Sequence, residues 1–151
     1  MPQSTSTVLM IRPAQFRSNE QTAVNNFFQA DTKIIGLNTK AQAEFDALVN
    51  KLIDAGIEVV VVNDTTDTDT PDAIFPNNWI SFHENGDVIL YPMFAENRRL
   101  ERREDIIEIL ESKGFVAEEI MDYSAAEEDG YFLEGTGSMV LDRENKKCYC
   151  I

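Results

Sequence analysis

Two short segments of the sequence concentrate side chains that could bind a polar ligand. The segment "PDAIFPNNW" begins at Pro71 and carries Asp72, Asn77 and Asn78, and the segment "LEGTG" carries Glu134. Carboxylates and side-chain amides offer hydrogen-bond acceptors and donors at fixed places, which suits a guanidinium or a neutral urea-like group. The alternatives are a turn role for Asp72, an exposed strand acid at Glu134 and an ordinary loop pair at Asn77-Asn78.

One arginine is a further candidate for binding, and the single histidine is not. Arg98 and Arg99 stand at the start of a predicted helix, where positive charge opposes the helix dipole. Either they are solvated surface arginines, or Arg98 grips a substrate carboxylate as a two-pronged donor. His83 lies beside a predicted turn at Asn85-Gly86, where a solvated imidazole explains it.

The sequence predicts neither a metal site nor a cofactor. "NDTTDTDTPD" lacks the central glycine and the terminal glutamate of a calcium loop. "EGTGSMV" leads into a predicted strand rather than a helix, so no phosphate cradle is expected. Cys148 and Cys150 alone are too few for zinc. We expect them to be reduced thiols on opposite faces of a strand, at least one in the core, in a cytoplasmic protein.

Composition narrows the classes of partner. The 151 residues suit one domain, and 43% hydrophobic residues can bury a core. The formal net charge of -14 argues against nucleic acid and against anionic membrane surfaces. No apolar run approaches the roughly 20 residues that span a bilayer, and no signal peptide is visible. A small-molecule ligand is the expected partner.

The first half of the chain predicts a strand, a loop, a helix and a second strand. The strand covers Thr7–Pro13, and a long polar loop follows to about Ile35. The helix is capped by Asn38 or Thr39 and ends at Ala55-Gly56, with apolar residues at helical spacing: Ala41, Phe45, Leu48 and Leu52. The β-branched run over residues 57–64 is typical of a strand covered on both faces.

The second half predicts two hairpins around a helix. A strand, a turn at Asn85-Gly86 and a second strand cover residues 71–92, and a helix over Asn97–Gly114 places Leu100, Ile107 and Leu110 on one face. A weaker strand over 115–122 and a polar loop follow. The second hairpin covers residues 131–150 and turns near Glu144-Asn145.

The two halves repeat one order of elements. "NKLIDAGIEVVVVND" and "IEILESKGFVAEEIMD" are both helix–glycine–strand units, and each feeds a hairpin whose first strand carries an acid, Asp72 or Glu134. We expect repeats over about 7–64, 65–122 and 123–151. Repeats arranged around an axis would bring the two acids to one central cavity. Because "CYCI" ends inside an apolar strand, we expect the chain to be the front part of a longer protein.

"PDAIFPNNWISFHENGDVILYPMFAENRRLERR" together with "FLEGTGSMVLDR" resembles the guanidino-group-modifying superfamily. That superfamily includes arginine deiminases, dimethylarginine dimethylaminohydrolases, succinylarginine dihydrolases and amidinotransferases. The resemblance covers most of the chain. It implies an α/β-propeller (pentein) fold of ββαβ-type units around a pseudo-fivefold axis, incomplete here, with about two to three blades present.

The resemblance also implies a mechanism. A cysteine attacks the guanidinium carbon and an amine leaves; a histidine, oriented by an acid, is the general acid and base, and water hydrolyses the intermediate. Carried over by motif, Glu134 is that acid and Asp72 binds substrate. Asn77 and Asn78 stand where hydrolase-type relatives often carry an acidic pair, and Arg98 matches the arginine for the substrate carboxylate.

Two departures from the family pattern matter. The Asn-Asn pair lacks two negative charges, which favours a ureido group or an enzyme tolerant of both groups, so citrulline is a candidate substrate. The family's downstream histidine, a second substrate arginine and the C-terminal nucleophilic cysteine are missing, so the chain alone should be inactive.

The leading hypothesis is the N-terminal portion of a cysteine-dependent hydrolase of amidine or ureido C–N bonds in an arginine- or citrulline-like amino acid. The alternatives are an amidinotransferase and a non-catalytic pentein-like binding or assembly module. We expect a homo-oligomer or a missing C-terminal half to cover the open strand edges.

Overall fold

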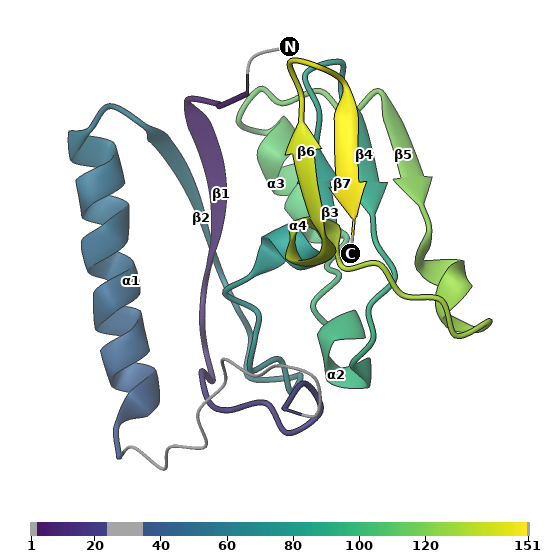
Figure 1. Ribbon diagram of the computed structural model, residues 1–151. Coiled ribbons are helices and arrows are strands. Elements are labelled where there is room, and N and C mark those ends of the chain that lie inside the picture. Colours follow the sequence, from purple (N-terminus) through teal and green to yellow (C-terminus); the bar gives the residue numbers. More distant parts are fainter. Residues whose placement is uncertain (1–2, 24–34, 151) are drawn as a thin grey trace. The chain divides into compact units, whose positions relative to one another are not determined.

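The computed structural model describes residues 3–23 and 35–150 and has an α/β fold (Figure 1). The chain divides into two compact units, which are described separately. Unit 1 comprises Met1–Thr5, Asn77–Phe94 and Arg102–Ile151, and unit 2 comprises Ser6–Pro76 and Ala95–Glu101. The long loop predicted before Ile35 lies partly outside the described residues.

Unit 2 is built on a strand–helix–strand segment. Strand β1 (Thr7–Arg12) pairs in parallel with β2 (Glu58–Asn63), and helix α1 (Leu37–Asp54) connects them, which confirms the three predicted elements. Val60 and Val62 are buried, whereas Val61 is 40% exposed. The prediction that this strand is covered on both faces is therefore wrong: burial alternates along β2, as in a strand with one covered face.

Helix α1 begins without the predicted side-chain cap. Gly36 occupies the cap position in the left-handed region, and no side chain caps the helix. Asn38 lies inside the first turn. Its Oδ1 accepts a 2.8 Å hydrogen bond from the Phe16 N–H, and its Nδ2 donates to the Ala14 carbonyl at 2.8 Å. Asn38 thus ties the helix to the loop after β1, so its assignment as a cap was wrong, as was that of Thr39.

Unit 1 contains a mixed three-stranded sheet. Strands β3 (Ile80–Phe82) and β4 (Asp87–Leu90) form the predicted hairpin, and β5 (Glu119–Asp122) pairs with β4 in parallel. Gly86 takes a φ of +86° in the connecting turn, which confirms the predicted turn position. Strand β5 covers only the second half of the predicted weak strand.

The first hairpin strand starts later than predicted. Residues 71–74 form a turn, with the Phe75 N–H donating to the Asp72 carbonyl, and a 3₁₀ helix covers Pro76–Asn78. Pro71 and Pro76 have no N–H to give to a ladder, which accounts for the delay. Asp72, Asn77 and Asn78 therefore precede the strand rather than belong to it.

The second hairpin also starts later than predicted. Strands β6 (Met139–Asp142) and β7 (Lys147–Cys150) pair on either side of the predicted turn. The four-residue helix α4 (Gly135–Ser138) comes before β6, so the expectation of a strand directly after Glu134 is wrong.

The two cysteines lie on the same face of β7. Their Sγ atoms are 3.4 Å apart and both residues are exposed, so the prediction of opposite faces and a core position is wrong. Side chains two residues apart in a strand point the same way, because the pleat has a period of two residues.

The helix predicted over Asn97–Gly114 is two helices. Helix α2 (Glu96–Arg99) belongs to unit 2, and α3 (Asp105–Glu111) to unit 1. Leu100 is 51% exposed, and Ile106 and Leu110 are the buried residues of α3. The break falls where the chain passes from unit 2 to unit 1, between the ion pairs Arg98–Glu101 and Arg103–Asp105.

The helices of the two predicted helix–glycine–strand segments end in the same way. In unit 2, the N–H groups of Gly56 and Ile57 donate to the carbonyls of Ile53 and Leu52. In unit 1, Gly114 and Phe115 donate in the same way to the carbonyls of Glu111 and Leu110. Both are Schellman motifs with glycine in the left-handed region, φ +83° and +95°. Each helix then leads to a strand parallel to the one before it.

Each unit has a core of buried apolar side chains. Trp79, Val88, Met93 and Ile106 are at most 2% exposed in unit 1, and Ile11, Phe45 and Val60 are buried in unit 2. Among the helices of the described ranges, none combines the length and apolar character needed to cross a membrane.

Candidate functional site

The two motif segments touch within unit 1. Asn77 Nδ2 donates to Thr136 Oγ1 at 2.9 Å, and Thr136 Oγ1 donates to the Asn77 carbonyl at 3.3 Å. A Cβ atom added at Gly135 would lie 2.3 Å from the Asn77 carbonyl oxygen, and one at Gly137 2.2 Å from Asn78 Nδ2. Only glycines allow this close approach, so the "EGTG" loop packs directly on the turn at Asn77-Asn78.

Glu134 is held at the start of this loop. Its Oε1 accepts a 3.1 Å hydrogen bond from the Phe94 N–H, and its backbone carbonyl accepts from the N–H of Gly137 at 2.8 Å. The rings of Phe94 and Phe132 pack edge to face at 5.3 Å, and both are about 40% exposed. Glu134 thus presents a carboxylate beside exposed aromatic surface, a combination suited to a planar cation.

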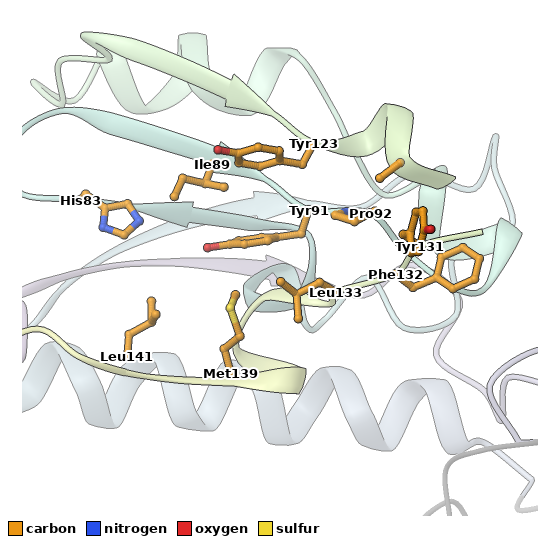
Figure 2. Close-up of a pocket in the computed structure, with 11 residues that line it drawn as sticks. His83, Ile89, Tyr91, Pro92, Tyr123, Tyr131, Phe132, Leu133, Met139 and Leu141 are labelled. Carbon is orange, nitrogen blue, oxygen red and sulfur yellow. The ribbon is translucent and has the colours of Figure 1, made fainter. Parts of the chain in front are cut away.

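An apolar pocket of about 410 Å³ lies in the same unit (Figure 2). Its lining is mainly aromatic and aliphatic, including Tyr91, Tyr123, Phe132, Leu133 and Met139. In Figure 2 the hydroxyl groups of Tyr91 and Tyr123 both point toward the end where His83 lies. The end of the pocket near His83 is therefore polar, and Phe132 and Leu133 connect the pocket in sequence to Glu134.

His83 belongs to a chain of hydrogen bonds at that polar end. Its Nε2 lies 3.1 Å from Ser81 Oγ, which lies 2.8 Å from the Tyr91 hydroxyl, and its Nδ1 lies 3.3 Å from Nη1 of Arg143. Burial, together with the charge of Arg143, lowers the pKa of His83. Because an arginine can only donate, the neutral ring accepts at Nδ1 and carries its proton on Nε2. His83 is half-buried, so the interpretation as a solvated imidazole was wrong.

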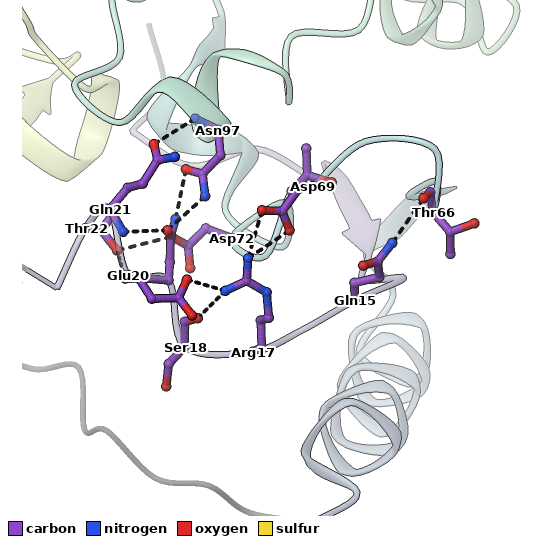
Figure 3. A network of polar contacts seen from close by, with 12 residues as sticks. Gln15, Arg17, Ser18, Glu20, Gln21, Thr22, Thr66, Asp69, Asp72 and Asn97 are labelled. Carbon is purple, nitrogen blue, oxygen red and sulfur yellow. Dashed lines mark hydrogen bonds and ion pairs between the residues drawn. The ribbon is translucent and has the colours of Figure 1, made fainter.

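Asp72 lies in a polar network of unit 2 (Figure 3). Its Oδ2 accepts a 2.7 Å hydrogen bond from Nδ2 of Asn19, which is fully buried. The amides of Asn19 and Asn97 bond each other in both directions, at 3.2 and 2.9 Å, and the Gln21 side chain accepts from the Asn97 N–H. Asp72 therefore anchors the loop after β1 as well as being a candidate ligand for substrate.

Arg98 is buried in the same unit and bound to an acid. Its Nε and Nη2 bond the two carboxylate oxygens of Glu101, each at 3.0 Å, and Nη2 also reaches the Phe75 carbonyl at 3.3 Å. The two side chains are 5% and 1% exposed, so the alternative of a solvated surface arginine is wrong for Arg98. Burial raises the pKa of Glu101 to about 7 against the opposing effect of Arg98, and nearby Asp72 adds to the rise.

The five predicted site residues thus fall into two groups. Asn77, Asn78 and Glu134 come together in unit 1, and Asp72 and Arg98 belong to unit 2. Sequence analysis missed Glu101, Asn19, Asn97 and Thr136. The spacing of three residues between Arg98 and Glu101 is a signal that could have found their ion pair. No comparable signal identifies Asn19, because its partners are far away in the sequence.

Within residues 3–23 and 35–150, no group of three or more histidine, cysteine, aspartate or glutamate side chains could hold a metal ion.

Comparison with solved structures defines the fold class. The N-terminal domain of ArgZ, described as an arginine dihydrolase from the ornithine-ammonia cycle in cyanobacteria, was solved as a mutant bound to substrate. It is 17% identical with a TM-score of 0.61, over 95% of this chain and 48% of that one. AgrE in a ternary complex with ornithine and NAD+ is 18% identical with a TM-score of 0.62, over 97% and 20%. The chain thus has the α/β fold of these domains and spans less than half of their length.

The family follows from a second comparison. The model of the family described as "N,N dimethylarginine dimethylhydrolase, eukaryotic" matches residues 12–151. The chain belongs to this family, which confirms the resemblance to the guanidino-group-modifying superfamily. A search of curated proteins found no match.

Proposed function

We propose that this chain is the N-terminal, substrate-binding part of a cysteine-dependent hydrolase acting on an amidine or ureido C–N bond of an arginine- or citrulline-like amino acid. One observation carries the proposal: the loop that begins at Glu134 packs on the turn at Asn77-Asn78. Two segments chosen from the sequence for guanidino chemistry, separated by more than fifty residues, therefore build one acceptor-rich corner.

The residues take the following roles in the proposal. Glu134 orients the catalytic histidine, and Asn77 and Asn78 bind the planar group of the substrate. Asp72 bonds a substrate N–H, for which Oδ1 is the oxygen not engaged by Asn19. Arg98 binds the substrate carboxylate as a two-pronged donor, and its ion pair with Glu101 holds the guanidinium in place.

The chemistry needs groups that the chain does not supply. Attack by a cysteine thiolate on the guanidinium carbon forms a C–S bond, and the C–N bond breaks as the amine leaves with a proton from the histidine. Water then breaks the C–S bond. The only histidine among the 151 residues is His83, which packs against Ser81 and Arg143. We propose that the remainder of the enzyme supplies the histidine, the cysteine and the further blades of a pentein propeller.

Product analysis tests this function. The complete protein is incubated with arginine, citrulline, succinylarginine and methylarginines, and ammonia and ureido products are measured. Release of ammonia or an amine in water supports the hydrolase. An amidinotransferase would form product only when an acceptor amine is added. Binding of these compounds without turnover would favour the non-catalytic binding module.

A further inference from the structure

We propose that Cys148 and Cys150 form a thiol–disulfide exchange site, at which a low-molecular-weight disulfide such as oxidised glutathione converts the two thiols into a reversible intrachain disulfide. Both cysteines belong to unit 1, which also contains the apolar pocket. They are distinct from the nucleophilic cysteine of the proposed hydrolase, which the remainder of the enzyme supplies in that proposal.

The fold brings the two sulfurs into contact. Cys148 and Cys150 are two residues apart in β7, so their side chains project from the same face, and their Sγ atoms are 3.4 Å apart. This is a hydrogen bond between thiols, longer than the S–S bond of about 2.05 Å that oxidation forms. Both residues are exposed, so a small disulfide can reach either sulfur.

The geometry of β7 favours a disulfide that is easily reduced again. Two residues of a strand advance about 6.5 Å, near the upper limit of the Cα separation of about 4.4–6.8 Å that a disulfide spans. The ladder to β6 resists any shortening of β7 around these residues. Exposed disulfides that compete with the surrounding structure are typically labile and regulatory, whereas structural disulfides resist reduction.

The register of the β6–β7 hairpin connects the thiols with the apolar pocket. Residues that pair directly across an antiparallel ladder have their side chains on the same face. Cys148 pairs with Leu141. Cys150 pairs with Met139, and both partners line the pocket (Figure 2). Burial raises the pKa of the Tyr91 hydroxyl, another lining group, and nearby Cys148 adds to the rise. A disulfide in β7 should therefore move side chains of the pocket wall.

The exchange runs in two steps. First, the thiolate of Cys150 attacks one sulfur of the small disulfide, whose S–S bond breaks, and the released thiolate takes a proton from water. The hydrogen bond with Cys150 raises the pKa of Cys148, which therefore keeps its proton during this step. Cys148 then gives its proton to water and attacks the Cys150 sulfur, and the second small thiol leaves. Two protein thiols are oxidised, and one small disulfide is reduced to two thiols.

Mass spectrometry after incubation with oxidised glutathione tests the site. The complete folded protein and its variants Cys148→Ser and Cys150→Ser are treated alike, free thiols are alkylated, and the mass of the peptide that carries both positions is measured. In the unaltered protein this peptide should lose two hydrogens. It should carry at least about tenfold fewer glutathione adducts than in either variant, because the neighbouring thiol displaces glutathione. Each variant has one thiol of the pair and should keep its adduct.

Methyl NMR of the oxidised protein tests the connection with the pocket. Oxidation should shift the methyl signals of Met139 and Leu141, with those of Val60 and Val62 in unit 2 as the control. Excess reduced glutathione should restore both the free thiols and the original signals.

Three results overturn the inference. The first is a peptide whose two thiols stay free, and the second is a peptide that holds glutathione in the unaltered protein as often as in the variants. The third is a disulfide that excess reduced glutathione does not open. A disulfide that forms without moving the signals of Met139 and Leu141 overturns the effect on the pocket.

Discussion

The predicted site residues of the two units differ in how many of their polar atoms already form hydrogen bonds or ion pairs with other residues of the chain. In unit 2, Arg98 is bound at two positions by Glu101, and Asp72 accepts from buried Asn19. In unit 1, Asn77 is exposed, and Thr136 engages only its nitrogen and its backbone carbonyl. The candidate residues of unit 2 therefore also hold a loop and a helix in place, in addition to the substrate roles proposed for them, whereas the Asn77 amide of unit 1 is bonded through its nitrogen.

The largest expected effect is on the buried ion pair. Arg98→Ala leaves the Glu101 carboxylate buried without its partner and should lower the free energy of unfolding by about 3–5 kcal/mol at pH 8. Urea unfolding measures the change. Replacing both residues, Arg98→Met with Glu101→Leu, should recover at least half of the loss. If Arg98→Ala lowers the free energy of unfolding by less than about 1 kcal/mol, the ion pair of unit 2 is no more stabilising than an exposed one, and the proposed difference between the units is wrong.

The pH dependence of stability sharpens the same contrast. The pKa of Glu101 rises from its ordinary 4.5 to about 7 because the carboxyl is buried, so the folded state holds this proton more tightly than the unfolded state. The contribution is complete below about pH 4.5 and is lost as the pH rises through about 7. It amounts to on the order of 3 kcal/mol.

The control for this pH dependence is Glu101→Gln. Urea midpoints at several values from pH 5 to pH 8 should fall more steeply for the unaltered protein than for the variant, whose amide does not titrate. Parallel curves would show that Glu101 keeps an ordinary pKa.

In unit 1 the expected effect is on turnover rather than on stability. Glu134→Gln keeps the shape of the side chain but removes its charge, so the proposed histidine loses its orienting group. In the complete enzyme, kcat should fall about 100-fold with a modest change in KM. Thermal unfolding is the control, because the Phe94 N–H keeps an oxygen acceptor. Unchanged kcat would exclude Glu134 from the mechanism.

The smallest effect is expected at the surface of unit 2. Arg17 is 38% exposed and pairs with Glu20 and with Asp69, the latter at 2.8 Å. Arg17→Ala should lower the free energy of unfolding by about 0.5 kcal/mol, and 0.5 M salt should reduce even that difference. A decrease in the free energy of unfolding above about 2 kcal/mol would show that Arg17 contributes as much as a buried polar residue such as Asn19.

The features of the fold that the sequence predicts are those encoded by residues close together in the chain. The helix over residues 37–54, the Asn85-Gly86 turn and the two helix–glycine–strand segments follow from patterns a few residues long. The delayed start of β6 and the break between α2 and α3 do not, because they depend on contacts made elsewhere in the chain. The delayed start of β3 does have a local cause, the prolines at positions 71 and 76, which the prediction did not use. The sequence also identified Asn77 and Glu134 as candidates, yet not Thr136, whose importance appears only when the two segments meet.

The central claim is that the corner formed by the 134–138 loop and the Asn77-Asn78 turn binds the planar group of the substrate. Titration of the ¹⁵N-labelled protein with L-arginine, followed by two-dimensional NMR, tests it directly. The account predicts saturable shifts of the Asn77 and Asn78 side-chain amides and of the Gly137 N–H. If these signals do not move and only those of residues in the apolar pocket do, such as His83 and Tyr91, the result contradicts the claim.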